Sequence, residues 1–127
     1  MSLLESVSHS TSFVSEDTLL EEVAILISGS EPGVVGVTRD GQPVGTISRY
    51  DLQTDAIALG HDLSRFSAKH IMRRRPITIE WPTDDLNLID AAINMQRSQA
   101  LHAVVTKNGV PAGLISYGAL MRYNLND

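Results

Sequence analysis

The hydrophobic positions of this chain alternate between helical spacing and short β-branched runs. Between Leu19 and Ile27 the apolar residues recur every three or four positions, as on one face of a helix. Val34 to Thr38 is instead a continuous apolar run, typical of a buried strand. The first half is therefore predicted to hold a strand at Thr11–Val14, N-cap candidates at Ser15–Thr18, a helix at Leu19–Ile27, strands at Val34–Thr38 and Val44–Ile47 around a hairpin turn at Asp40-Gly41, and a helix at Arg49–Leu59 ending at Gly60.

The second half repeats this order of elements. It is predicted to hold a short bridging helix at Ser67–Met72, a strand at Pro76–Ile79, a helix capped by Thr83–Asp85 whose apolar face is Leu86, Leu88, Ile89, Ala92, Ile93 and Met95, strands at Leu101–Thr106 and Gly113–Ile115 around a turn at Asn108-Gly109, and a closing helix at Tyr117–Tyr123. Each half is thus β-α-β-β-α. Because half of this length can hardly bury a stable core alone, we expect the two sheets to pack together. The predicted fold is α/β (α+β), with repeats at 8–60 and 64–124 related by a pseudo-twofold axis.

A gapless internal repeat supports this plan. Sliding the chain by 68 residues aligns Gly41–Ser48 with Gly109–Ser116 and Leu52 with Leu120. Asp51, however, aligns with Ala119. The second half therefore repeats the pattern of the first but lacks a counterpart of Asp51.

Composition excludes several classes of function. The net charge of −5 disfavours a nucleic-acid surface, and the absence of cysteine excludes disulfides and thiolate metal sites. The scattered histidines show no zinc spacing. No apolar run is long enough to cross a bilayer, and we expect a cytoplasmic location.

The pair Ser48 and Asp51 is the strongest chemical feature. Ser48 stands where a helix N-cap belongs, and Asp51 projects from the same helix end. A hydroxyl and a carboxylate at a positive helix terminus can hold vicinal hydroxyls, such as those of a ribose. The alternative is a capping box with only a structural role.

Both halves resemble a cystathionine-β-synthase (CBS) domain, and the pair resembles a Bateman module. The resemblance runs from about Thr11 to Arg122, and the first half departs from the usual Met-x-x-x-Pro lead-in at His9–Ser12. It is carried by the segments Gly45–Leu52, Ile71–Ile79, Leu88–Met95 and Ala103–Ser116.

The resemblance implies an adenosine ligand, AMP, ADP, ATP or S-adenosylmethionine, in a cleft between the repeats. The family's ribose motif is matched by Gly45–Asp51 except at Thr46, whereas Gly113–Ala119 fails at its last position. By this analogy Ser48 and Asp51 hold the ribose, Ser116 and Ala119 form a weakened second site, Thr78, Ala100, Leu101 and His102 form the wall for the base, and Arg49 or the run Arg73, Arg74 and Arg75 meets phosphates.

Each of these assignments has a structural alternative. The arginine run is also typical of a solvated helix end, and His102 of a residue packed at the edge of a core. The aligned pair Phe13 and Trp81 favours packing over base stacking. No nucleophile elbow or P-loop lysine is present, so we expect no catalytic activity.

Two hypotheses therefore remain. The first is a sensor that binds an adenine nucleotide and signals to a partner or attached domain. The second is a dimerisation module in which ligand binding is weak or lost. In either case we expect a homodimer, with the apolar faces around Leu20, Ile27, Leu88 and Ile93 as its interface.

Overall fold

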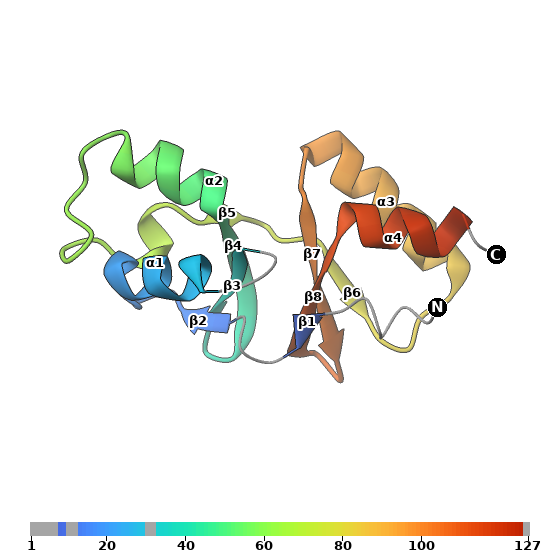
Figure 1. The fold of residues 1–127 in the computed structure, drawn as a ribbon. Coiled ribbons are helices and arrows are strands. Elements are labelled where there is room, and N and C mark those ends of the chain that lie inside the picture. The colour runs from blue at the N-terminus through green and yellow to red at the C-terminus, as the bar shows by residue number, and fades with distance from the viewer. Residues whose placement is uncertain (1–7, 10–12, 30–32, 126–127) are drawn as a thin grey trace. The chain divides into compact units, whose positions relative to one another are not determined.

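The computed structural model describes residues 8–9, 13–29 and 33–125. The chain divides into two compact units between Pro76 and Ile77, and the N-terminal strand β1 (Ser8–His9) belongs with the later unit. Each unit is a sheet of four strands with two α-helices on one of its faces (Figure 1). The mixed α/β class predicted from the sequence is confirmed.

The first unit contains the first repeat. Its elements are β2 (Phe13–Ser15), α1 (Leu20–Ser28), β3 (Val34–Arg39), β4 (Gln42–Ser48), α2 (Arg49–Leu52) continued by a π-helical turn at Gln53–Ile57, a 3-10 turn at Ala68–His70, and β5 (Arg73–Arg74). The strand order is β2-β3-β4-β5. Its core is built from both helices and the inner face of β3 and β4.

The second unit contains the second repeat. Its elements are β1 (Ser8–His9), β6 (Thr78–Glu80), α3 (Asp85–Ser98), β7 (His102–Lys107), β8 (Val110–Ser116) and α4 (Tyr117–Leu125). The strand order is β1-β8-β7-β6. Because β1 pairs with β8 and β5 pairs with β4, each short lead-in strand joins the sheet of the other repeat.

The hairpins of the two repeats match in detail. β2 runs parallel to β3 and β6 runs parallel to β7, and β3 and β7 pair antiparallel with β4 and β8. The register shifts between Val37 and Thr38 in one hairpin and between Val105 and Thr106 in the other. Both turns place two consecutive residues at positive φ, which explains why each ends in glycine. The two hairpin predictions are confirmed.

The start of α1 differs from the prediction. Its N-cap is Leu19, without a side-chain cap, and Ser15 instead accepts a hydrogen bond from the amide of Asp17 in the turn before the helix. The first two amides of α1 donate to the carbonyls of Phe66 and Leu63. The predicted cap was wrong because a distant loop satisfies these amides, which removes the need for a local side chain.

The predicted bridging helix at Ser67–Met72 is also shorter than expected. Only Ala68–His70 forms a single 3-10 turn, in which the Ser67 amide donates to Nδ1 of His70. The turn is fixed to the first repeat, since the Ala68 amide donates to the carbonyl of Thr18. The segment therefore belongs to the packing of the first unit.

The buried faces of α1 and α3 correct two further predictions. Leu86, Ile89 and Ile93 belong to the predicted apolar face of α3, yet they are 74%, 46% and 38% exposed. Three of the four residues proposed for a dimer interface are instead core residues, namely Leu20, Ile27 and Leu88. The residues of α3 that face the sheet are Leu88, Ala91, Ala92 and Met95. The apolar side chains left in solvent on α1 are Ile25 and Leu26.

Candidate functional site

Ser48 and Asp51 form a complete capping box at the start of α2. The hydroxyl of Ser48 accepts from the Asp51 amide at 3.1 Å, and Oδ2 of Asp51 accepts from the Ser48 amide at 2.9 Å and from its hydroxyl at 3.0 Å. Asp51 is only 7% exposed. The capping box itself is present, and it holds the carboxylate in one orientation at a helix N-terminus.

The second oxygen of this carboxylate remains available. Among the described residues, no hydrogen bond to Oδ1 of Asp51 is found. No buried polar side-chain atom in that part of the chain lacks a partner, so Oδ1 must reach solvent. One oxygen thus fixes the side chain, while the other can accept a hydrogen bond from a ligand.

The second repeat keeps the hydroxyl and loses the acid. Ser116 accepts from the amide of Ala119 at 3.1 Å, which reproduces half of the capping box at the start of α4. Ala119 is 6% exposed and packs in the apolar core of this unit. The two strand–helix junctions therefore have the same backbone form, but only the first carries a charge.

Arg49 is directed toward the end of α1. Its amide donates to the carbonyl of Gly33 at 2.9 Å, and its guanidinium donates to the carbonyl of Ile27 at 3.3 Å. A cation at a helix C-terminus interacts favourably with the helix dipole. Arg49 thus stands beside Ser48, but one of its guanidinium nitrogens has a structural partner.

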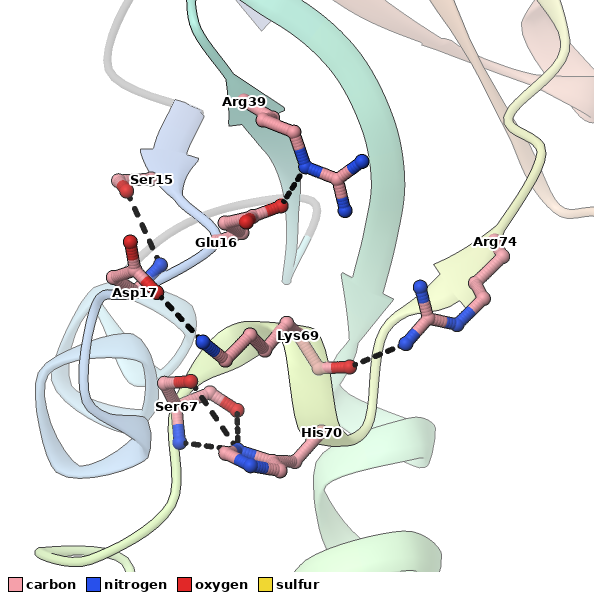
Figure 2. A network of polar contacts seen from close by, with 8 residues as sticks. All are labelled: Ser15, Glu16, Asp17, Arg39, Ser67, Lys69, His70 and Arg74. Atoms are coloured by element: carbon pink, nitrogen blue, oxygen red, sulfur yellow. Dashed lines mark hydrogen bonds and ion pairs between the residues drawn. The ribbon is translucent and has the colours of Figure 1, made fainter.

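The arginine run does not end a helix. Arg73 and Arg74 form the edge strand β5, and Arg75 follows at φ 57. The helix-end interpretation of this run was therefore wrong. The guanidinium of Arg74 donates to the carbonyl of Lys69 at 3.2 Å (Figure 2).

A polar network holds β5 in place. Lys69 pairs with Asp17 at 3.0 Å, and Arg39 pairs with Glu16 at 2.6 Å (Figure 2). These exposed pairs are worth about 0–1 kcal/mol each. The Lys69–Asp17 pair and the Arg74 hydrogen bond connect the 3-10 turn and β5 to the start of the first repeat, whereas the Arg39–Glu16 pair links β3 to the turn after β2.

The close approach of β5 explains why the motif that contains Ser48 begins with a glycine, Gly45. A Cβ at this position would lie 2.7 Å from Sδ of Met72 and 2.8 Å from the carbonyl oxygen of Arg73. Because neither atom can be approached so closely, only glycine lets β5 pair with β4. The motif's glycine therefore serves strand packing in this unit.

The residues predicted to form the base wall all lie in the second unit. Thr78 is exposed on β6, in register with Val104. Leu101 is 61% exposed, and His102 is half-buried opposite Ser116. The Leu101 carbonyl accepts from the Tyr117 amide, as the Gly33 carbonyl accepts from Arg49 in the first unit. Within this unit the structure thus brings Leu101 and His102 beside the weakened motif, next to the half-buried Ala100.

Comparisons with known proteins agree with the fold described above. Residues 6–56 match the family model for the CBS domain. A putative signal-transduction protein with CBS domains from Burkholderia ambifaria is 17% identical, with a TM-score of 0.75 over 98% of this chain and 92% of that one. The chain is a tandem pair of CBS folds. The family model covers the first repeat, and the second repeat is assigned by its fold.

Two further similar structures contain nucleotides. The CBS domain of a bacterial CNNM/CorC family Mg²⁺ transporter in complex with ATP is 20% identical, with a TM-score of 0.72 over 97% of this chain and 86% of that one. CBSX2 in complex with AMP is 21% identical, with a TM-score of 0.67 over 96% of this chain and 94% of that one. No curated protein matches the sequence.

Neither a membrane-spanning helix nor a cluster of metal ligands is found in the described residues of the CBS pair. None of their helices has the length and apolar character needed to span a membrane. No group of three or more histidine or acidic side chains stands close enough to hold a metal ion in residues 8–9, 13–29 and 33–125.

Sequence analysis missed a set of polar residues beside β6. Asn87, Asp90 and Asn94 on α3 line a hollow with Thr78 and Thr83. Their spacing of three and four residues could have indicated a polar helix face. The apolar residues from which α3 was predicted lie on the opposite side of the helix.

Glu80 anchors the second hairpin. Its carboxylate accepts from the Thr106 hydroxyl at 2.7 Å and from the amides of Asn108 and Gly109 at 2.6 and 3.0 Å. The Thr106 hydroxyl is the largest of the causes that lower the pKa of Glu80, followed by the Gly109 amide. This ionised carboxylate therefore stabilises the turn.

We expect Glu80→Gln to lower the melting temperature more at about pH 7 than at about pH 3. Because the folded-state pKa is lowered, the stabilisation is complete above the ordinary value of 4.5 and is lost as the pH falls through the folded value. Thermal melts of both proteins across this range measure the difference. An equal difference at both pH values would contradict the ionic role, and Glu22→Gln on the exposed face of α1 is the control.

Proposed function

We propose that this CBS pair is a regulatory module that binds an adenosine-containing ligand. The candidate ligands are AMP, ADP, ATP and S-adenosylmethionine. Occupancy is passed to a partner or to an attached domain, and the module itself has no catalytic role. Such signalling requires that the ligand prefer one arrangement of the module over another.

One observation carries the proposal. Asp51 is a buried carboxylate whose orientation is fixed through Oδ2 and whose Oδ1 has no hydrogen bond among the described residues. A carboxylate placed in this way can accept hydrogen bonds from the two adjacent hydroxyls of a ribose. The AMP and ATP complexes of proteins with the same fold support adenine nucleotides as the ligand class.

The remaining contacts complete the proposed site. Thr78, Ala100, Leu101 and His102 supply the wall for the base. Phosphates are met by Arg49 or by the arginine run, of which Arg75 is exposed and begins the connection to β6. Since Ala119 lacks the acid, we propose at most one tight adenosine site per chain.

Thermal melts with each candidate ligand test the proposal. A ligand that binds only the native state raises the melting temperature, and about 100 times its Kd corresponds to about 2.7 kcal/mol. We expect a shift with at least one of AMP, ADP, ATP and S-adenosylmethionine. The absence of any shift at millimolar concentration would favour the second candidate, a dimerisation module without ligand control.

A homodimer is part of either candidate. Ile25 on α1 and Ile93 on α3 occupy equivalent positions of the two repeats and are 70% and 38% exposed, with Ile89 beside Ile93. Exposed apolar side chains on helices are typical of an association surface. We expect sedimentation to report a dimer for the native chain and a folded monomer for the double variant Ile25→Glu, Ile93→Glu. Unchanged sedimentation of the variant would exclude this surface.

A further inference from the structure

A hollow of about 330 Å³ lies between β6 and α3 of the second repeat. This volume is in the range of binding pockets, about 300–1,000 Å³. All of its lining residues belong to the second unit, and Asp51 is not among them. Thr78 also belongs to the proposed base wall, but the acid of the proposed nucleotide site lies outside the hollow.

One wall of the hollow is an open strand edge. β6 is the last strand of its sheet, so one of its edges pairs with β7 and no other described strand pairs with the opposite edge. The Ile77 carbonyl accepts from the Val104 amide, and the Trp81 amide donates to the Thr106 carbonyl. Because alternate residues of a strand point their peptide groups to opposite edges, those of Thr78 and Glu80 face the unpaired side.

The other wall is a polar face of α3. Asn87, Asp90 and Asn94 lie on successive turns, and no side-chain hydrogen bond is found for any of them among the described residues. The lining contains two acids, Asp90 and Glu80, and no lysine or arginine. Since Glu80 is already occupied by the β7–β8 turn, Asp90 is the acid available to an occupant.

We infer that this groove binds an extended peptide segment carrying a lysine or an arginine. The segment adds to the free edge of β6 through the peptide groups of Thr78 and Glu80, as in known cases of strand addition. Its basic side chain pairs with Asp90, and Asn87 and Asn94 hydrogen-bond its flanking peptide groups. Charge complementarity selects this occupant, because a phosphate or carboxylate would meet two acids and no counter-ion.

A selected peptide tests the inference. A phage library of random heptapeptides is selected on the full chain, and enriched peptides are synthesised and titrated by fluorescence anisotropy. We expect the enriched peptides to contain lysine or arginine. We also expect Asp90→Asn to weaken their binding about tenfold, the loss expected from one charge-assisted hydrogen bond. Glu22→Gln on α1 removes the same charge from an exposed face of the other unit and should leave the affinity unchanged.

Amide resonances locate the bound peptide. In ¹⁵N spectra of the full chain we expect peptide to shift the amides of Thr78 and Glu80, and Asp51→Ala to leave this binding unchanged. A failure to enrich any peptide, equal affinity for Asp90→Asn, or shifts confined to other elements would overturn the inference. It would also be overturned if AMP displaced the peptide while shifting the side-chain amides of Asn87 and Asn94, because the hollow would then belong to the nucleotide.

Discussion

Replacing Asp51 by alanine is expected to weaken the binding of AMP or ATP at least tenfold. The carboxylate would make charge-assisted hydrogen bonds of roughly 1.5–3 kcal/mol to ribose hydroxyls, and about 1.4 kcal/mol corresponds to a factor of ten in affinity. Isothermal titration calorimetry of the native and variant proteins with the same nucleotide measures the loss.

The same substitution removes a helix cap, so the control variant must also remove a helix cap. Asp51→Ala deletes the hydrogen bonds to Ser48, and cap losses of this kind cost about 1 kcal/mol of stability. Asp84→Ala deletes the side-chain cap of α3, where Asp84 accepts from the Asn87 amide, and Asp84 is not among the residues proposed to hold the nucleotide. We expect this control to lower the melting temperature while retaining nucleotide affinity. An unchanged affinity for Asp51→Ala would remove Asp51 from the site.

Replacing Leu88 by alanine is expected to lower the free energy of unfolding by about 2–5 kcal/mol. Leu88 is 1% exposed and packs in the core of the second unit, so its truncation leaves a cavity between α3 and the sheet. Urea denaturation followed by circular dichroism measures the loss. The variant should keep the slope of the native transition, because the folded structure exposes little new surface.

Leu86 provides a matched control two residues earlier on the same helix. It is 74% exposed, and Leu86→Ala should change the free energy of unfolding by no more than about 0.5 kcal/mol. Both variants make the same chemical change in the first two turns of α3. Equal losses for the two would contradict the packing of this helix.

The repeat and its hairpins were predictable because their causes are local. Asp40-Gly41 and Asn108-Gly109 adopt positive φ at both positions, and this requirement is visible in the residue types themselves. Asp84 caps α3 through the amide of Asn87, inside the segment predicted to do so. Ser48 and Asp51 likewise stand three residues apart, so their contact follows from the sequence.

Which side of α3 faces the sheet could not be predicted from the local sequence. Its apolar residues occupy two neighbouring flanks, and only the positions of the sheet and of α4 decide that Leu88 and Met95 face inward while Ile89 does not. The cap of α1 failed for a similar reason, since Phe66 and Leu63 accept from amides more than forty residues away along the chain.

The site was partly predictable. The spacing indicated the acid and its hydroxyl, and the structure buries Asp51 except where its Oδ1 reaches solvent. The partners of the arginines were not visible, because the Ile27 carbonyl and the Lys69 carbonyl are backbone groups brought close by the fold. The spacing of Asn87, Asp90 and Asn94 indicates a polar helix face, but such a face is also typical of a solvated helix, so the hollow beside it was not predictable.

The number of nucleotides bound per chain tests the central claim most directly. Native mass spectrometry of the full chain with AMP or ATP counts them without assuming where they bind. With an acid at Asp51 and an alanine at its counterpart Ala119, the account predicts one tightly bound nucleotide per chain. Two equivalent nucleotides per chain, or none at millimolar concentration, would contradict it.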